Sequence, residues 1–269
     1  MTPQEKLSLL QENIKLRHSL TVAFSGGVDS TFLLKAAHDI LNNWLLAVIV
    51  RMEAFPEREF KEAENYVKEM GIKYVVLPFD EFNIPGFSDN PPDRCYLCKK
   101  ALFREIIRHS KAHGIDCVAD GSNLDDLLDY RPGMKAVREL GIVSPLQEAG
   151  MTKDDIRILS REMGLSTWNK PSFACLASRF PFGDKITREK MHMVDQGEEY
   201  LISLGFDQVR VRCHGKLARI EVAPAARSKF FSIDLMDQIV QRFTQIGFSY
   251  VSLDLQGYRT GSTNNQDGK

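Results

Sequence analysis

The sequence has no excess of charge of either sign. Its 35 Lys and Arg residues nearly balance 36 Asp and Glu residues, so the net charge is −1 over 269 residues. A basic nucleic-acid-binding surface normally shows as an excess of positive charge, although a whole-chain sum hides a local basic face. The composition therefore gives no support to a nucleic-acid partner, and we expect none.

Long apolar runs are also lacking. No stretch of about 18 apolar residues occurs, and the first residues have neither the basic segment nor the apolar core of a secretory signal. We therefore expect a cytoplasmic protein with no membrane partner. The hydrophobic fraction of 43% and the charged fraction of 26% are typical of a folded soluble chain, large enough for one large domain or two ordinary ones.

Cysteine is scarce, with five residues in the chain. In a reducing compartment, cysteines are more often catalytic, metal-binding or buried than paired in structural disulfides. Cys117 falls inside a short apolar run and Cys213 on the apolar face of an alternating segment, so we expect both to be buried as small hydrophobic residues. Cys95, Cys98 and Cys175 remain, in loop or loop-to-helix contexts.

These three cysteines allow several interpretations. A structural zinc site normally takes four protein ligands, which three thiols do not supply. A redox disulfide between Cys95 and Cys98 would leave Cys175 unexplained. An iron–sulfur cluster is usually held by four thiolates, so three would leave one iron open to an exogenous sulfide. The Cys-x-x-Cys pair could also be an incidental surface feature.

The first half of the chain alternates short apolar runs with helical patterns. This order is typical of a doubly wound α/β fold, in which helices cover both faces of a parallel sheet. The expected strands span residues 20–24, 45–50 and 73–78, with helices over 30–42 and 57–70 between them.

The later part of the chain has a different character. A helix is expected over 153–163, with Thr152 and Asp155 as an approximate capping box. From about residue 186 the order becomes helix, strand, strand, helix, strand, which predicts a smaller C-terminal α+β domain. We therefore divide the chain into domains 1–168 and 169–269. The proline-bearing stretch 84–93 is expected to be an exposed loop, and the polar tail from Gly261 to be disordered.

A glycine-rich loop joins the first expected strand to the helix that follows it. Residues 25–30 read Ser-Gly-Gly-Val-Asp-Ser. Gly26 and Gly27 allow a sharp turn and a close approach to phosphate, and the next helix directs its first amides at an anion. A Walker A motif with its phosphate-binding lysine is absent, so this is a phosphate loop of another kind.

Polar side chains in and near this loop complete the predicted nucleotide site. Ser25 and Ser30 offer hydroxyl donors, and Asp29 can hold the Mg²⁺ that accompanies a nucleotide. A further buried run over 116–120 ends in a polar turn. Because ligands bind at the carboxyl ends of parallel strands, residues of this turn should lie near the first loop. They are Asp120, Gly121 and Asn123.

Two arginines alternate with apolar residues in the C-terminal part. The segment 209–214 places Arg210 and Arg212 on one strand face by its period of two. Such a pair suits a phosphate or a carboxylate, because each guanidinium can donate two parallel hydrogen bonds. The alternative is a solvated outer face with a salt bridge to Glu221.

These motifs together resemble a known family. The loop is similar to the pyrophosphate loop, or PP-loop, of the ATP pyrophosphatases, which include GMP synthetase and the tRNA thiolases. The Cys-x-x-Cys pair, the segment 170–179 and the arginine strand narrow the resemblance to the LarE family of ATP-dependent sulfur transferases. It covers nearly the whole chain and includes segments 129–133, 168–170, 178–181 and 253–255.

The resemblance implies a reaction and a substrate. In this family, ATP adenylates a carboxylate of pyridinium-3,5-biscarboxylic acid mononucleotide, and sulfur then replaces AMP to give a thiocarboxylate for the nickel-pincer nucleotide cofactor. The implied ATP-binding residues, with Asp29 as the Mg²⁺ ligand, are Ser25, Gly26, Gly27, Asp29, Ser30, Asp120, Gly121 and Asn123.

The resemblance also implies roles for the cysteines. Family members with one cysteine, at the position resembling Cys175, give up its sulfur, whereas members with three carry an open [4Fe-4S] cluster that presents sulfide. Because Cys95 and Cys98 are present, we expect Cys95, Cys98 and catalytic Cys175 to hold a cluster that an external sulfide donor supplies.

The small-molecule nucleotide substrate is expected to bind in the C-terminal domain. By resemblance, Arg179, Arg210 and Arg212 would hold its phosphate, and Glu198 would orient a guanidinium or accept from the ribose. A homo-oligomer is expected on the same ground. The alternatives are a [4Fe-4S]-dependent tRNA thiolase and a nonenzymatic nucleotide- or metal-binding module.

Overall fold

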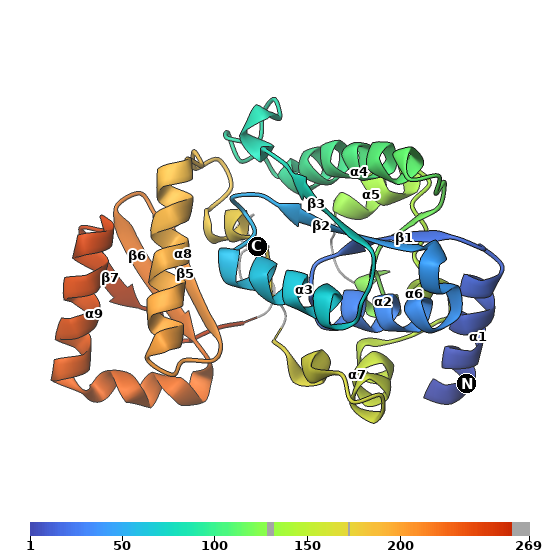
Figure 1. Cartoon of the computed structure of the whole chain (residues 1–269). Helices are drawn as coiled ribbons and strands as arrows, with labels where there is room; N and C mark the ends of the chain where they lie inside the picture. The colour runs from blue at the N-terminus through green and yellow to red at the C-terminus, as the bar shows by residue number, and fades with distance from the viewer. Residues whose placement is uncertain (128–131, 172, 260–269) are drawn as a thin grey trace. The chain divides into compact units, whose positions relative to one another are not determined.

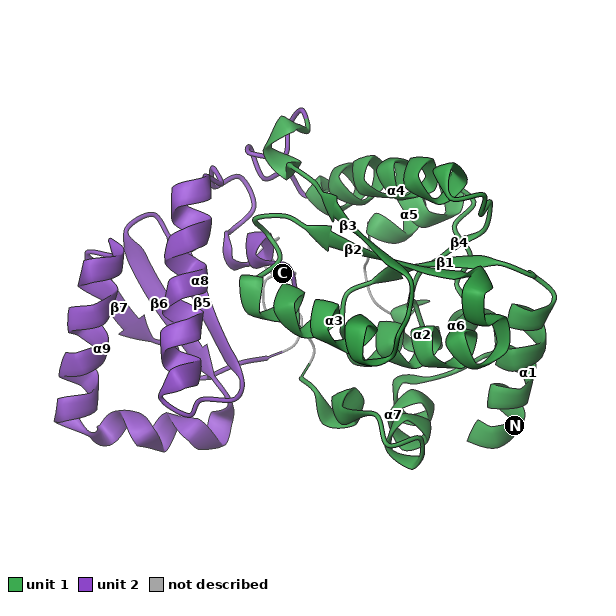
Figure 2. Ribbon diagram, viewed as in Figure 1, with its two compact units in different colours: residues 1–84, 93–173 green, residues 85–92, 174–269 purple. Residues whose placement is uncertain are grey.

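The chain forms two compact units, each with its own sheet (Figure 2). A computed structural model describes residues 1–127, 132–171 and 173–259. Unit 1 comprises Met1–Ile84 and Asp93–Phe173, and unit 2 comprises Pro85–Pro92 and Ala174–Lys269. The domain boundary expected after residue 168 stays a prediction. Residues 129–131, which carry part of the resemblance, and the tail from Gly261 lie outside the described residues.

Unit 1 contains a parallel sheet with the strand order β3-β2-β1-β4 (Figure 1). The strands are β1 (Leu20–Phe24), β2 (Leu45–Arg51), β3 (Tyr74–Pro78) and β4 (Val118–Ala119). Val22 of β1 lies opposite Ala47 of β2. The doubly wound α/β fold and the positions of its first three strands are therefore confirmed.

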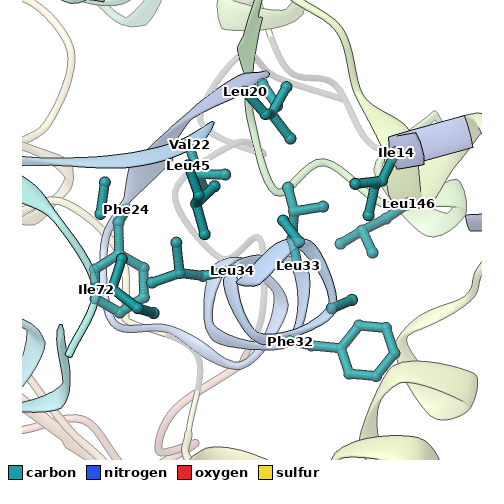
Figure 3. Close-up of a cluster of buried hydrophobic side chains, with 14 of the residues drawn as sticks. Ile14, Leu20, Val22, Phe24, Phe32, Leu33, Leu34, Leu45, Ile72 and Leu146 are labelled. Atoms are coloured by element: carbon teal, nitrogen blue, oxygen red, sulfur yellow. The ribbon is translucent and has the colours of Figure 1, made fainter. Parts of the chain in front are cut away.

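Helices cover both faces of this sheet. They are α1 (Pro3–Lys15), α2 (Val28–Leu41), α3 (Glu57–Glu69), α4 (Arg94–Ala112), α5 (Gly133–Glu139), α6 (Pro145–Glu148) and α7 (Lys153–Glu162). Because side chains alternate along a strand, Val22 and Ala47 join one core, in which Val22 faces Leu33 and Leu34 of α2 (Figure 3). Leu46 joins a second core with Phe103 of α4. The expected capping box of Thr152 and Asp155 opens α7.

Unit 2 contains a three-stranded sheet with the order β5-β6-β7. The helix α8 (Arg188–Ser203) precedes β5 (Val209–His214) and β6 (Leu217–Val222), and α9 (Ile233–Ile246) precedes β7 (Tyr250–Leu253). Strands β5 and β6 are antiparallel, and β6 and β7 are parallel. The α+β order expected for the C-terminal part is confirmed. None of the helices in the described ranges has the length and apolar character needed to cross a bilayer.

The stretch 84–93 is not wholly exposed, which corrects the expectation from sequence. Phe87 is 1% exposed and Asn90 is fully buried. The Asn90 side chain donates to the carbonyl of Pro181 at 2.6 Å, and its own carbonyl accepts from Gly183 at 2.9 Å. The stretch is partly buried because Asn90 pairs with a segment about ninety residues later in the chain, and local composition does not reveal such a partner.

Candidate functional site

The nucleotide loop, residues Ser25–Ser30, follows β1 and includes the first turn of α2. Gly26 has a φ of +67°, in the left-handed region that favours glycine. A Cβ at this position would lie 3.0 Å from the Cβ and 3.3 Å from the Cα of Ala63 in α3. Gly26 is therefore required by the fold itself, because the loop turns directly against α3.

Gly27 is at the N-cap of α2 and makes no side-chain cap. Its φ is −79°, which any residue can adopt. Among the described residues, an added Cβ would meet only the Ser25 Oγ, at 3.6 Å. The fold does not require glycine here, so the bare backbone leaves room for a group that approaches the first turn of α2.

The two serines of the loop hydrogen-bond to each other. Their hydroxyls lie 3.1 Å apart, and the Ser30 hydroxyl donates to the carbonyl of Gly27 at 3.2 Å. Ser30 is buried, whereas Ser25 is exposed. Ser30 therefore shapes the loop, and Ser25 presents its hydroxyl at the surface.

Asp29 extends from the first turn of α2 and has two partners. Its carboxylate accepts from the ammonium of Lys153 at 2.5 Å and from the side-chain amide of Asn123 at 3.3 Å. The carboxylate fits Mg²⁺, which proteins often bind through one or two carboxylates together with substrate phosphates. Lys153 was missed from the sequence, because only the fold brings it to a residue 124 positions away.

The turn after β4 lies against the nucleotide loop, as expected. A Cβ on Gly121 would lie 3.0 Å from the backbone nitrogen of Ser30, so glycine permits this close approach. Buried Asp120 accepts from the hydroxyls of Ser122 at 2.6 Å and Ser144 at 2.7 Å. Asp120 therefore holds this turn in place, while its part in ATP binding stays a prediction.

Lys170 links the nucleotide loop to α3. Its ammonium lies 2.8 Å from Glu59 and 2.7 Å from Glu62, and it donates to the carbonyl of Gly26 at 3.3 Å. Burial by itself lowers the pKa of Lys170, but the hydrogen bonds to the two glutamates outweigh it and raise the pKa. The ammonium is thus held in its charged form by two carboxylates.

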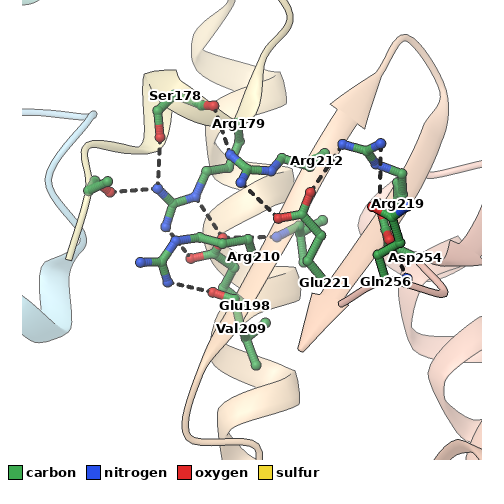
Figure 4. Close-up of polar contacts among 12 residues, drawn as sticks. Ser178, Arg179, Glu198, Val209, Arg210, Arg212, Arg219, Glu221, Asp254 and Gln256 are labelled. Atoms are coloured by element: carbon green, nitrogen blue, oxygen red, sulfur yellow. Dashed lines mark hydrogen bonds and ion pairs between the residues drawn. The ribbon is translucent and has the colours of Figure 1, made fainter. Parts of the chain in front are cut away.

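Unit 2 contains a buried ion pair between Arg179 and Glu198 (Figure 4). Arg179 is fully buried and Glu198 is 1% exposed; two parallel contacts of 2.8 and 2.9 Å join them. Burial raises the pKa of Glu198, but the charge and hydrogen bonds of Arg179, with the Val211 backbone hydrogen bond and the Arg210 charge, together outweigh it and lower the pKa. The other Arg179 nitrogen donates to the carbonyls of Ala174 at 2.6 Å and Cys175 at 3.2 Å. Glu198 thus orients a guanidinium that fixes the backbone of Cys175.

The arginine strand is buried, so the solvated-face alternative is wrong. Arg210 is 7% exposed and Arg212 is 5% exposed. The salt bridge to Glu221 that this alternative included does form: the Arg212 guanidinium lies 2.7 Å from the Glu221 carboxylate. Arg210 lies with its guanidinium carbon 4.9 Å from the ring centre of Tyr258. Burial, with the nearby positive charge of Arg179, lowers the pKa of Arg210.

This cluster, counted over described side chains, joins four arginines to three carboxylates. Its members are Arg179, Arg210, Arg212 and Arg219 with Glu198, Glu221 and Asp254. The excess of one positive charge suits an anionic group such as a phosphate. Binding of the substrate phosphate by these arginines stays a prediction.

Of the two cysteines expected to be buried, Cys213 is buried and Cys117 is only partly so. Cys213 is buried, and burial raises the pKa of its thiol to about 11. Cys117 is half-buried against the core, and its pKa is also raised by burial. Cys95 and Cys98 lie one turn apart at the start of α4, in unit 1, and exposed Cys175 belongs to unit 2. Cys95 and Cys98 are thus at the start of a helix, and Cys175 directly precedes a short 3₁₀-helix, Leu176–Arg179.

The three-cysteine site stays a prediction. No group of three or more metal-ligating side chains occurs within the part of the chain that the structure describes. The chemistry of the donors fits a cluster in one respect. Two thiols spaced i, i+3 share a helix face, and the guanidinium of Arg94 lies 3.8 Å from the Cys95 sulfur.

The parallel sheet, the nucleotide loop and the Asp29 side chain define an ATP-using enzyme of the PP-loop pyrophosphatase class. Comparison with known proteins agrees, although no family model matches the chain. One similar protein is a component of the glutamine-hydrolyzing GMP synthase of Thermoplasma volcanium. The chain is 24% identical to it over 72% of its own length and 67% of the relative.

Two relatives align along nearly the whole chain. One is the pyridinium-3,5-bisthiocarboxylic acid mononucleotide synthase of Lactiplantibacillus plantarum, 38% identical over 96% of this chain and 94% of the relative. Another is an uncharacterized protein of Synechocystis, 39% identical over 97% of both chains. The chain belongs to the LarE family of PP-loop sulfur transferases.

Proposed function

We propose that this enzyme activates a carboxylate of pyridinium-3,5-biscarboxylic acid mononucleotide with ATP and replaces the activating group with sulfur. The observation that carries the proposal is the nucleotide loop, with bare Gly27 at the start of α2 and Asp29 two residues later. The full-length similarity to the Lactiplantibacillus enzyme supports the choice of substrate. A cytoplasmic location is part of the proposal.

The first half of the reaction is an adenylation. A substrate carboxylate oxygen attacks the α-phosphorus of ATP, and the bond to the bridging oxygen breaks, so pyrophosphate leaves with the bonding electrons. The first amides of α2 and the Ser25 hydroxyl bind phosphate oxygens. Mg²⁺ held by Asp29 would neutralise charge on those oxygens. The protein therefore contributes mainly alignment and charge stabilisation.

The second half replaces AMP with sulfur. In the acyl-adenylate the carbonyl carbon is electrophilic and AMP is a good leaving group, so a sulfur nucleophile forms a C–S bond as the C–O bond breaks. Cys175 is the residue at which sulfur is handled, and Arg179 fixes its backbone from the buried pair with Glu198. Arg210 and Arg212 provide positive charge for the substrate phosphate.

The sulfur source in this proposal is a [4Fe-4S] cluster held by Cys95, Cys98 and Cys175. Such a cluster would present sulfide on the iron that has no protein thiolate. The competing route is loss of the Cys175 sulfur itself, which leaves dehydroalanine. The pair Cys95 and Cys98 on one face of α4 favours the cluster route, because a sacrificial mechanism needs no second or third thiol.

The deciding experiment is anaerobic reconstitution followed by iron and acid-labile sulfide analysis. Wild type and Cys117→Ala, a control that alters a thiol outside the set, should bind iron equally, whereas Cys98→Ala should not. Turnover with ATP and substrate should release pyrophosphate and leave the mass of the protein unchanged. A wild-type protein that binds no iron and loses about 34 Da at Cys175, as a sulfur and two hydrogens leave, would refute the cluster.

The alternative functions have separate tests. The chain is 24% identical over 57% of its length to a tRNA-specific 2-thiouridylase of Rickettsia africae. Tight, salt-sensitive retention of tRNA on a filter would favour a thiolase, which the net charge of −1 does not suggest. ATP binding without pyrophosphate release in the presence of the pyridinium substrate would indicate a nonenzymatic module. Sedimentation would test the homo-oligomer that we also propose.

A further inference from the structure

The chain turns back onto the sheet of unit 2 after its last strand. β7 ends at Leu253, and the next residues, 254–258, form what we call the C-terminal strap. The backbone nitrogen of Asp254 donates to the carbonyl of Ile220 at 2.8 Å, and that of Tyr258 donates to the carbonyl of Val222 at 2.8 Å. Both acceptors belong to β6. The strap is therefore hydrogen-bonded to β6 at both of its ends.

Contacts within the strap fix its path. The carboxylate of Asp254 lies 3.5 Å from the guanidinium of Arg219 (Figure 4) and accepts from the backbone nitrogen of Gln256 at 2.8 Å. Gly257 is buried and has a φ of +73°, and an added Cβ would lie 2.7 Å from the carbonyl oxygen of Val222. Glycine permits this conformation and this close approach without strain. The last turn of the strap thus has one well-defined course.

The strap ends with an aromatic ring against a buried cation. The guanidinium carbon of Arg210 lies 4.9 Å from the centre of the Tyr258 ring, and Arg210 is 7% exposed. Burial and the charge of Arg179 lower the pKa of Arg210, whereas Glu198 and Tyr258 act in the opposite direction. A ring face attracts a cation more strongly where water is excluded. The ring therefore helps to hold this guanidinium in one place.

A tyrosine holds a cation without offsetting its charge. The Arg212 guanidinium lies 2.7 Å from the carboxylate of Glu221, which contributes a negative charge. An aromatic ring attracts a guanidinium through its π face and brings no such charge. Counted over the described side chains, the cluster of four arginines and three carboxylates thus keeps its excess of one positive charge. A guanidinium that is already fixed binds a phosphate at a smaller cost in ordering.

We infer that Tyr258 is a positioning residue of the anion site in unit 2: its ring fixes the Arg210 guanidinium, without neutralising it, for the phosphate of the substrate nucleotide. This inference rests on the proposed function, since it assumes that the arginine cluster binds that phosphate. The C-terminal strap thereby becomes part of the substrate site, although Tyr258 lies 48 positions after Arg210 and belongs to no strand or helix.

The test compares Tyr258→Leu, which removes the ring face, with Tyr258→Phe, which keeps it. Isothermal titration would use the pyridinium mononucleotide and ribose 5-phosphate, with the nucleotide loop filled by an ATP analogue that cannot be cleaved between its α- and β-phosphates. Tyr258→Leu should bind both ligands about three- to thirtyfold more weakly. Tyr258→Phe should stay within about twofold of wild type, since cation–π attraction does not need the hydroxyl. The affinity for ATP, titrated alone, should be unchanged in both variants.

Further variants and a kinetic measurement separate positioning from a loss of folding. Tyr250→Leu is the matched control, because Tyr250 lies on β7 of the same unit and is 69% exposed; it should match wild type. Gly257→Ala should displace the strap and weaken the same two ligands. Gly215→Ala should not, because Gly215 has a φ of +63° and an added Cβ would meet nothing within 4 Å. In steady state, Tyr258→Leu should raise the KM for the mononucleotide and leave kcat within about twofold.

Other outcomes would overturn the inference. Equal affinity of wild type and Tyr258→Leu for the mononucleotide would refute it and leave the proposed function intact. So would an equal loss for ATP, or a loss in Tyr258→Phe as large as that in Tyr258→Leu, because neither follows from a missing ring face. If wild type binds ribose 5-phosphate but not the mononucleotide, and Tyr258→Leu loses the first, the inference holds and the proposed substrate is wrong. If wild type binds neither ligand, the arginine cluster is not a phosphate site and the inference fails.

Discussion

Alanine at each glycine of the nucleotide loop separates what the fold requires from what the ligand requires. Gly26→Ala places a side chain in the left-handed region, at a cost of about 1–2 kcal/mol. It also places a Cβ 3.0 Å from that of Ala63, and such overpacking adds about 1–3 kcal/mol. The free energy of unfolding should therefore fall by about 2–5 kcal/mol in total.

Gly27→Ala should behave in the opposite way. The backbone angles suit alanine and the nearest contact is an ordinary 3.6 Å, so the free energy of unfolding should change by less than about 1 kcal/mol. The new methyl group instead lies where phosphate must approach the first turn of α2. ATP should bind about tenfold more weakly or worse, equivalent to about 1.4 kcal/mol.

Urea denaturation and ATP titration of both variants provide the measurements. Gly71→Ala is the control for strain alone, because Gly71 has a φ of +64° and an added Cβ would meet nothing within 4 Å. Gly26→Ala should lose more stability than Gly71→Ala, by the amount due to Ala63. Unaltered ATP affinity in Gly27→Ala would refute the assignment of the loop as a phosphate site, and equal stability of the Gly26 and Gly71 variants would refute the packing argument.

Three further predictions concern buried groups. The lowered pKa of Glu198 means that its contribution to stability is present above the ordinary carboxyl pKa of about 4.3 and is lost as the pH falls through the folded-state pKa. Urea unfolding between about pH 3 and pH 6 should show this loss in wild type and less of it in Glu198→Gln. Ser144→Ala removes a donor to buried Asp120 and should lower the free energy of unfolding by about 1.5–3 kcal/mol; an unchanged urea midpoint would count against it. Iodoacetamide at neutral pH should label exposed Cys95 well before Cys213, whose thiol has a pKa of about 11, and peptide mass spectrometry that found the reverse order would contradict the burial of Cys213.

Much of unit 1 follows from local pattern. Short apolar runs predicted the strands over 20–24 and 45–50. Successive side chains of a strand point to opposite faces of the sheet, and both sets must be apolar when helices cover both faces. The glycine pair before a helix predicted the nucleotide loop. The capping box at Thr152 predicted the start of α7, because a cap depends on residues only three positions apart.

The burial of polar side chains was harder to predict from the sequence. The pattern of β5 predicted that Arg210 and Arg212 share a face, but it could not show whether that face meets water. Glu198 and Glu221 come from other elements, and their carboxylates make the burial of the guanidinium groups possible. The same limit applies to Asn90, whose partners lie far along the chain.

By itself, the sequence determined the class of fold, the nucleotide loop and the family, because these depend on periodicity and on short motifs. Only the tertiary structure decided which charges meet. Lys153 carries no motif that distinguishes it from other surface lysines, and its contact with Asp29 arises because α7 packs beside α2. Ion pairs of this kind depend on distances that the packing of whole elements sets, and a linear pattern does not encode those distances.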